Sequence, residues 1–353
     1  MFAMTSRALS QLARYSAAML MLLLASPHTF AQAQPNSSAT SGRMLGAKQT
    51  VYPDWFKQSF LDFRADIAEA AQAGKTVILL FHQDGCPYCN ALVERNLSQR
   101  KIEQKLRDKF EIVALNIWGD RDIVSVSGQS FTEKEFAAAL KVQFTPSLLF
   151  FDAQANLALR LDGYLPPREF SAALDYIASD ASKTKSYQAF LKARAPAKAR
   201  PSARAPSAPI NLANLPRDKP TLIVFEQADC AACDDLREQV LGALETQAQL
   251  AKFHQVRLDM WSHTALTTPR GESTTVRAWV DALKLKYAPS LVLFDALGSE
   301  VIRADAYFKS FHVRGLLDYV ASRQYLREPN FQRFLSERAD QLKASGADVN
   351  IWQ

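Results

Sequence analysis

The feature that most constrains this chain is an internal repeat. Residues 81–89 read FHQDGCPYC, and residues 225–233 read FEQADCAAC, an offset of 144 positions. Four further segments recur in the same order at nearly the same offset: 115–118 with 258–261, 145–152 with 288–295, 175–179 with 318–322, and 187–191 with 331–335. Solenoid repeats are only about 20 to 50 residues long, so this longer period indicates duplication of a whole domain.

The repeat predicts two domains, 44–192 and 210–345, joined by a spacer at 193–209. The spacer consists mainly of Ala, Pro, Arg and Ser and contains no aromatic residue, so it cannot build a core of its own. Its four prolines favour extended backbone. We therefore interpret this segment as a semi-stiff spacer, with a charged docking site as the alternative.

The formal net charge of +6 is concentrated in two short segments outside the predicted cores. Arg7 and Arg14 lie near the N-terminus, and five basic residues lie within 192–204; without these seven charges the rest of the chain carries −1. Nearly neutral domains lack the basic face that binds nucleic-acid phosphates. We therefore expect no nucleic-acid partner, and the 22% of charged residues also excludes a membrane-embedded bundle.

The N-terminal segment has the layout of a secretory signal peptide. A basic start is followed by an apolar run at 17–25 and by the small residues of 31–33. The apolar run is about half the ~20 residues that a membrane-spanning helix needs. We therefore predict a signal peptide at 1–33 and an exported protein without stable membrane insertion. A retained amphipathic N-terminal anchor is the alternative.

Hydrophobic runs and capping signals predict an α/β fold for both domains. The expected strands are 76–81, 111–117, 147–152 and 157–161, and then 221–226, 255–260, 290–295 and 300–303. Helices are expected from each first cysteine onward, to about 98 in the first domain, and then near 136–140, 167–179, 276–283, 311–321 and 330–342. Thr132 and Glu135 form a capping-box signature. The fold class predicted is two tandem α/β domains, each a mixed sheet flanked by helices and closed by a β-hairpin.

All four cysteines lie in the two Cys-X-X-Cys pairs. A disulfide that closes such a short loop removes little entropy from the unfolded chain, so its role as a structural staple is weak. A thiol at the start of a helix has a lowered pKa and supplies thiolate for exchange. We predict Cys86 and Cys230 as nucleophiles, with Cys89 and Cys233 resolving the mixed disulfides.

Two other roles for the cysteines stay open. Paired Cys-X-X-Cys motifs also ligate zinc, although these pairs lie 144 residues apart in separate domains of a chain predicted to be exported. An inert disulfide is the second alternative. It applies more to the second pair, whose intervening residues are Ala231 and Ala232.

Proline recurs behind each cysteine pair. Pro146 follows Cys86 by 60 positions and Pro289 follows Cys230 by 59, each directly before an apolar run. This arrangement resembles the thioredoxin superfamily. The resemblance implies that both prolines are cis and that the chain around them binds substrate peptides through Thr145–Pro146 and Ala288–Pro289.

Further motifs narrow the resemblance. Ser127-Gly128-Gln129, the segment 132–135, Thr145-Pro146 and the segment 163–166 are similar to the SoxW-like branch of periplasmic thioredoxins. The likeness covers 76–179 well and 221–322 more loosely. It implies a protein that reduces disulfides outside the cytosol.

The chain departs from the thioredoxin pattern at several positions. Leu80 and Val224 stand where many thioredoxins carry a buried aspartate. Four nearby polar residues are either proton-transfer groups or simply solvated: His82, Asp84, Glu226 and Asp229. Trp118 and Trp261 either border the sites or pack in the core. Because Ala288 replaces the threonine before proline, the second copy is expected to have drifted from catalysis.

Together these features predict an exported thiol–disulfide oxidoreductase. We expect it to act in the periplasm as a reductase of protein disulfides, without a cofactor or metal, and to take electrons from a membrane thiol carrier. The alternatives are a peptide-binding, chaperone-like module with a weakly active or inactive second domain, and a disulfide isomerase.

Overall fold

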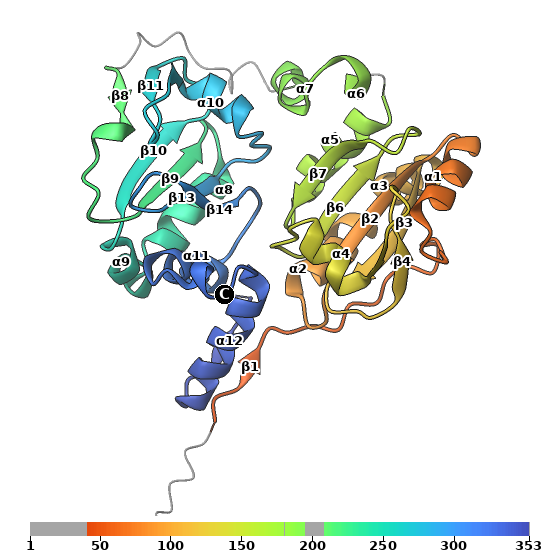
Figure 1. Cartoon of the computed structure of the whole chain (residues 1–353), viewed down its shortest axis with the longest axis horizontal. Helices are drawn as coiled ribbons and strands as arrows, with labels where there is room; N and C mark the ends of the chain where they lie inside the picture. The colour runs from red at the N-terminus through yellow and green to blue at the C-terminus, as the bar shows by residue number, and fades with distance from the viewer. Residues whose placement is uncertain (1–40, 180, 195–207, 353) are drawn as a thin grey trace, which may run out of the picture. The chain divides into compact units, whose positions relative to one another are not determined.

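The computed structural model describes residues 41–179, 181–194 and 208–352 (Figure 1). The predicted signal peptide and most of the predicted spacer lie outside these ranges. The described residues belong to one compact unit, within which two repeats of the same α/β fold follow each other. No helix among the described residues is long and apolar enough to cross a bilayer.

The first repeat is built on a mixed four-stranded sheet. Its strands are β2 (Thr76–His82), β3 (Phe110–Asn116), β6 (Ser147–Phe151) and β7 (Leu157–Asp162). They lie in the order β3-β2-β6-β7, which can be followed across the repeat in Figure 1. β2 runs parallel to β3 and antiparallel to β6, and β6 is antiparallel to β7. The central strand β2 is therefore paired on both edges, as its apolar sequence requires.

Helices cover both faces of this sheet because successive side chains of a strand point to opposite faces. α1 (Phe63–Gln72) and α4 (Glu133–Ala139) share a core with Val77, Leu79 and Phe81. The other face, with Ile78 and Leu80, packs with α3 (Arg100–Lys109) and α5 (Pro167–Ile177). Alternate residues of β2 thus belong to two separate cores. Both faces of the strand that leads to the first cysteine are therefore buried.

The second repeat reproduces the sheet. Its strands β9 (Thr221–Glu226), β10 (His254–Asp259), β13 (Ser290–Phe294) and β14 (Glu300–Ala304) lie in the order β10-β9-β13-β14. α9 (Leu244–Leu250), α10 (Val276–Ala282) and α11 (Ser310–Ala321) correspond to α3, α4 and α5. The repeats differ at their start. Where the first repeat has α1, the second has strand β8 (Ile210–Asn211) and the short 3₁₀ helix η3 (Leu212–Asn214).

A small hairpin precedes the helix that follows the second parallel strand in each repeat. β4 (Asp122–Val124) pairs with β5 (Ser130–Thr132), and β11 (Ala265–Thr267) pairs with β12 (Ser273–Thr275). β8 extends the second hairpin to three strands. The capping box at the start of α4 is present: the Thr132 hydroxyl accepts from Glu135 N–H and the Glu135 carboxylate accepts from Thr132 N–H.

The ends of the described chain meet. β1 (Met44–Leu45) pairs in parallel with β15 (Val349–Asn350), which follows α12 (Phe331–Ala344). The second domain therefore continues beyond the predicted boundary at 345. β15 has only two residues, and its backbone groups are satisfied by pairing with β1 at the other end of the described chain, which local sequence does not reveal. The boundary at 192 also shifts. α6 (Ala181–Thr184) is followed by α7 (Tyr187–Arg194), which runs two residues into the predicted spacer.

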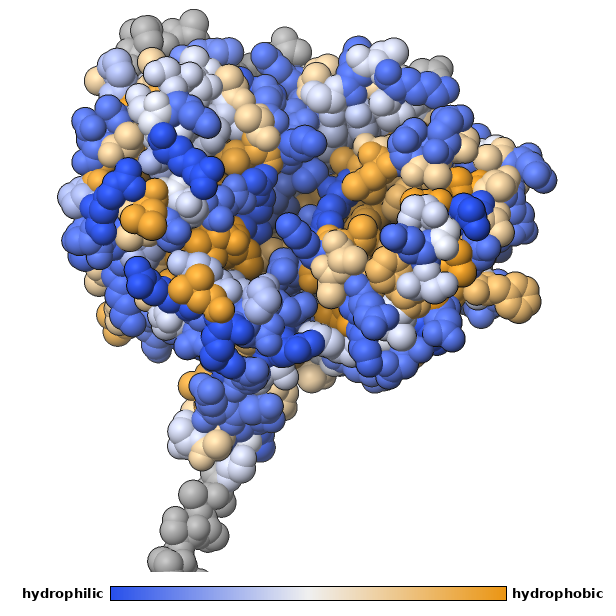
Figure 2. All heavy atoms as spheres, in the orientation of Figure 1, coloured by the Kyte–Doolittle hydropathy of each residue, from blue (hydrophilic) through white to orange (hydrophobic). Residues whose placement is uncertain are grey.

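On the face drawn in Figure 2, hydrophilic side chains predominate and apolar side chains gather in patches between them. Among the described residues, the large apolar side chains that stay exposed are Met44, Val51, Phe60, Trp118, Leu157, Leu244, Leu297 and Leu326. One of them, Trp118, follows the end of β3 by two residues.

Candidate functional site

The first Cys-X-X-Cys begins a helix, as expected. Cys86 is the N-cap of α2 (Pro87–Ala91), which continues as the π-helix η1 (Leu92–Leu97). The Sγ atom of Cys86 accepts the N–H of Cys89 at 3.0 Å. Gly85, directly before it, has φ +72°, a conformation that suits glycine. The turn therefore places the first sulfur at the positive end of the helix dipole.

The second motif has the same geometry on a different sequence. Cys230 is the N-cap of α8 (Ala231–Asp235), which continues as the π-helix η4 (Leu236–Leu241). Cys233 N–H donates to the Sγ atom of Cys230 at 3.1 Å. Asp229 takes the left-handed position with φ +51°; aspartate is one of the few non-glycine residues that occupy this region readily. Loss of the glycine has therefore not removed the turn.

Each motif holds its own disulfide. Cys86 is bonded to Cys89 and Cys230 to Cys233, with Cα–Cα distances of 5.3 and 5.2 Å. All four cysteines of the chain are thus paired within their motifs. Within 41–179, 181–194 and 208–352, no three His, Cys, Asp or Glu side chains are arranged to hold a metal ion.

The proline loops lie beside the cysteines. The Thr145–Pro146 and Ala288–Pro289 bonds are both cis, as the resemblance implies. The carbonyl oxygen of Thr145 lies 3.6 Å from the Cys86 Sγ, and the Thr145 hydroxyl donates to the same sulfur at 3.4 Å. The Ala288 carbonyl oxygen lies 3.6 Å from the Cys230 Sγ. The structure therefore brings the eight predicted site residues together as two sites in which sulfur and proline-loop backbone have the same arrangement.

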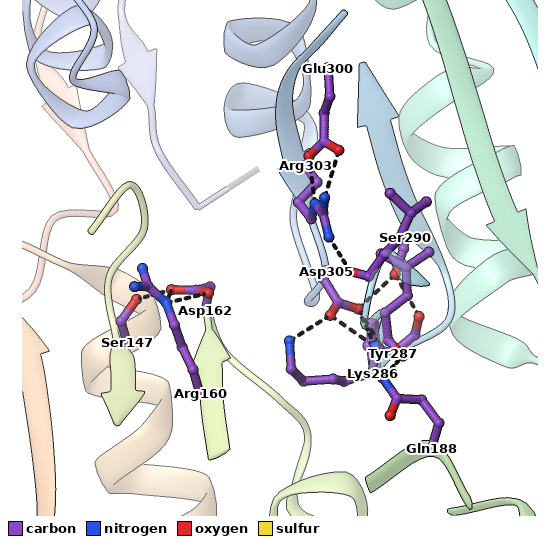
Figure 3. Close-up of polar contacts among 12 residues, drawn as sticks. Ser147, Arg160, Asp162, Gln188, Lys286, Tyr287, Ser290, Glu300, Arg303 and Asp305 are labelled. Atoms are coloured by element: carbon purple, nitrogen blue, oxygen red, sulfur yellow. Dashed lines mark hydrogen bonds and ion pairs between the residues drawn. The ribbon is translucent and has the colours of Figure 1, made fainter. Parts of the chain in front are cut away.

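A buried aspartate anchors the second proline loop. Asp305, at the end of β14, accepts the N–H groups of Lys286 and Tyr287 and the hydroxyl of Ser290 (Figure 3). Burial raises the pKa of Asp305. Its counterpart in the first repeat, Asp162, is only partly buried and accepts from Ser147 and Arg160. Asp305 thus fixes the backbone that presents Ala288.

A tryptophan–glutamine pair borders each site. The indole N–H of Trp118 donates to Gln83 Oε1 at 2.9 Å, and that of Trp261 donates to Gln227 Oε1 at 2.9 Å. Each glutamine stands three residues before a first cysteine, so both tryptophans border the sites. Trp261 also packs in the core of its repeat, whereas Trp118 is exposed. The two glutamines are not among the predicted site residues. Their recurrence in both copies was the signal that could have found them.

No carboxylate stands behind the cysteines at the position used by many thioredoxins. Leu80 and Val224 are both buried in the core. Of the nearby polar residues, Asp84 lines a cavity beside Cys86, and Glu226 pairs with Arg237 at 3.4 Å. Burial lowers the pKa of His82, which keeps its ring neutral near neutral pH.

The first site is covered by the second repeat. Cys86 is only 3% exposed and Tyr88 2%. The Tyr88 hydroxyl accepts the N–H of Lys309 at 3.0 Å and lies 3.3 Å from His312 Nδ1. Burial lowers the pKa of His312 to about 3, so the ring is neutral at neutral pH and shares one hydrogen bond with the tyrosine hydroxyl. The ring of Trp352 also contacts Tyr88, at a centroid distance of 5.1 Å.

The start of α12 completes this cover. The Gln83 side chain donates to Gln332 Oε1 at 2.8 Å, and Gln332 donates to the carbonyl of Gln143 at 2.9 Å. The N–H of Phe331 donates to the Gln143 side chain at 2.7 Å. A cavity of about 150 Å³ lies beside Cys86. The second site differs, because Cys230 and the neighbouring Ala232 are both partly exposed.

The two α/β domains, each with a disulfide at a helix start beside a cis-proline, define a thioredoxin-fold redox protein. The family model for the thioredoxin-like domain matches residues 63–178 and 213–321. The chain therefore belongs to the thioredoxin-like family. Its two Cys-X-X-Cys disulfides make it a thiol–disulfide oxidoreductase.

Solved structures give more distant matches. A thioredoxin-fold protein from Helicobacter pylori is 20% identical, with 34% of this chain and 84% of that chain covered and a TM-score of 0.32. A thioredoxin from Thermus thermophilus is 22% identical, with 40% and 89% covered and a TM-score of 0.28. A disulphide isomerase from Xylella fastidiosa is 16% identical, with 42% and 100% covered and a TM-score of 0.25. No match was found among the curated proteins.

Proposed function

We propose that this oxidoreductase is exported and reduces protein disulfides in the periplasm. The observation that carries the proposal is the second site, where the partly exposed Cys230 begins a helix and its sulfur lies 3.6 Å from the Ala288 carbonyl oxygen of the cis-proline loop. Export rests on the N-terminal sequence pattern. The direction of electron flow rests on the resemblance to the SoxW-like branch.

In the reaction, the reduced first cysteine attacks one sulfur of a substrate disulfide as its thiolate. A mixed disulfide forms, and the released substrate sulfur leaves as a thiolate and takes up a proton. The second cysteine then loses its proton and attacks the first, which releases the other substrate thiol. The substrate disulfide gains two electrons and the Cys-X-X-Cys pair becomes a disulfide. A dithiol carrier in the membrane restores the thiols and is itself oxidised.

Each chain group has a role in this sequence. The helix start stabilises the attacking thiolate of Cys86 or Cys230. The N–H of the second cysteine donates to the same sulfur. The backbone of Thr145 or Ala288 faces the incoming peptide, and the Thr145 hydroxyl adds a further donor at the first site.

Exchange kinetics and redox equilibria test this function. We expect the purified protein to catalyse reduction of a disulfide peptide by a dithiol, and the Cys86→Ala, Cys230→Ala double variant to be inactive. Equilibration of each pair with glutathione gives its potential. We expect a reductase to have a reduction potential of about −270 mV, like thioredoxin, whereas a potential of about −120 mV would indicate an oxidase.

Cell fractionation tests the location. The protein is expected in the periplasmic fraction, and deletion of residues 1–33 is expected to retain it in the cytoplasm. Periplasmic recovery of the deleted form would contradict a signal peptide.

The first site also favours a second candidate function. Because Cys86 is only 3% exposed under its cover, this site is poorly placed for thiol exchange, and the protein would instead be a module that binds peptides without exchange. Cys89→Ala and Cys233→Ala variants separate the two functions. An enzyme accumulates mixed disulfides with its partners, first through the partly exposed Cys230 and more slowly through the covered Cys86. A binding module captures the same partners when all four cysteines are replaced by alanine.

A further inference from the structure

A cavity of about 410 Å³ opens beside the second site. Its wall includes Ala288, which precedes the cis-proline, and the hydrogen-bonded pair of Trp261 and Gln227. The cavity therefore borders the Ala288 backbone, against which the proposed function places a substrate. Met260 and Leu285 supply apolar wall.

The charged residues of this cavity are mainly basic. Arg168, Arg194, Arg277 and Lys286 line it, against the single acid Glu169. Arg168 and Arg194 come from α5 and α7, and the side chain of Gln188 in α7 donates to the carbonyl of Leu285 at 3.3 Å. Each of these cations pairs with a carboxylate: Arg168 with Glu169, Arg194 with Asp175, Arg277 with Asp281 and Lys286 with Asp305. The lining is therefore close to neutral, and an anionic ligand is favoured only by a cation that has a donor left over.

One of these cations has an uncommitted donor. Arg277, in α10, is 8% exposed. Its Nη2 donates to Asp281 at 2.6 Å and its guanidinium lies 4.4 Å from the centre of the Trp261 ring. Its buried Nη1 has no hydrogen-bond partner in the structure. Since most buried donors are hydrogen-bonded, this unpaired donor on a residue that lines the cavity favours a ligand acceptor.

The first repeat has no equivalent. Lys134 occupies the position of Arg277: their N–H groups donate to the matching carbonyls of Gly119 and Ser262. The Lys134 side chain is exposed and pairs with Asp120. The buried arginine is therefore a property of the second site alone.

We propose that this cavity binds a carboxylate of the disulfide substrate, so that the second site selects acidic peptides. The inference rests on the proposed exchange function. The Arg277 Nη1 donates to the carboxylate, and the apolar wall holds the hydrocarbon part of an aspartate or glutamate side chain. The peptide backbone then lies against Ala288, with its disulfide at Cys230.

Binding of unreactive peptides tests the selectivity without any exchange step. A peptide with serine in place of cysteine and a neighbouring glutamate is titrated into the whole protein by calorimetry, alongside its glutamine analogue. We expect the glutamate peptide to bind about tenfold more tightly, the scale of one charge-assisted hydrogen bond. Arg277→Gln is expected to remove this preference, and Lys134→Gln, the matched control, to leave it intact.

Exchange kinetics with the corresponding disulfide peptides give a second measurement. In a Cys86→Ser, Cys89→Ser background, Arg277→Gln is expected to raise KM for the acidic substrate about tenfold with little change in kcat. Arg277→Lys, which keeps the charge, is expected to restore part of the preference. If Arg277→Gln does not fold, the comparison of the two peptides on the unaltered protein still decides the question.

Three results would overturn the proposal: equal affinity for the two peptides, equal losses in Arg277→Gln and Lys134→Gln, or displacement of the acidic peptide by an equal concentration of inorganic phosphate. The experiments distinguish failure of the proposed exchange function from failure of the proposed acidic-peptide site. Selective binding without any exchange would reject the proposed function and keep the acidic site. Exchange without selectivity would reject only the site.

Discussion

At the scale of single residues, the two copies reach the same geometry with different side chains. Gly85 and Asp229 both take the left-handed turn before the first cysteine. Thr145 and Ala288 both place a carbonyl oxygen 3.6 Å from sulfur. Replacement of threonine therefore removes a hydroxyl donor but leaves the backbone in position. The expectation of drift from catalysis remains a prediction for the second copy.

Asp305 shows how much one buried carboxylate contributes to that backbone. Asp305→Ala leaves the N–H groups of Lys286 and Tyr287 and the hydroxyl of Ser290 without this acceptor. We expect a loss of about 3 kcal/mol in the free energy of unfolding, since each unsatisfied buried donor costs about 1 to 3 kcal/mol. Urea denaturation measures the change.

The matched control is Asp162→Ala in the first repeat. Asp162 is partly exposed and accepts only from side chains, so we expect a loss of about 1 kcal/mol. Equal losses at the two positions would show that burial of Asp305 does not distinguish them.

At the scale of elements, the long apolar strands were predictable and the short or highly charged elements were not. The predicted strand 221–226 is β9 itself, and the other predicted core strands differ from the observed ones by one or two residues. α3 escaped prediction because its ten residues bury only Ile102 and Leu106. Strands of two or three residues, such as β1 and β4, are too short for alternation to be recognised.

The contact between α11 and α2 carries a titratable group that gives it a pH dependence. Burial lowers the pKa of His312 to about 3, against 6.5 in an unfolded chain. Because the unfolded state binds the proton more readily, the stability contributed by neutral His312 is present above pH 6.5 and is lost as the pH falls toward 3. At pH 5 the loss is about 2 kcal/mol.

Unfolding curves at pH 7 and pH 5 measure this effect. His312→Gln removes the titrating group, so its free energy of unfolding is expected to change less between the two pH values than that of the unaltered protein. Identical pH dependence in the two proteins would contradict the assignment.

At the scale of the whole molecule, the two sites differ in access. The first disulfide lies under Lys309, His312 and the start of α12, whereas Cys230 is partly exposed. A reductant must displace the cover before it reaches Cys86. In the described structure, a reductant therefore reaches the second site before the first.

We predict that a protein dithiol reduces the Cys230–Cys233 disulfide faster than the Cys86–Cys89 disulfide. Reduction of the covered pair slows about tenfold for every ~1.4 kcal/mol that opening costs. Timed alkylation followed by mass spectrometry of the two motif peptides measures both rates.

Gln332→Ala is the informative variant, because this side chain bonds to both Gln83 and Gln143 across the cover. It is expected to accelerate reduction at Cys86 and leave the rate at Cys230 unchanged. Equal reduction rates of the two disulfides in the unaltered protein would show that the cover does not limit access.

The sequence by itself determined the duplication, the α/β class and the two Cys-X-X-Cys pairs with their prolines. These follow from local patterns: apolar runs, residue spacing and the recurrence of motifs 144 positions apart. Only the tertiary structure decided that the first cysteine is covered, that Arg277 is buried with an unpaired donor, and that β15 pairs with β1. Each of these depends on contacts between segments far apart in the chain, whose register and burial no local pattern encodes.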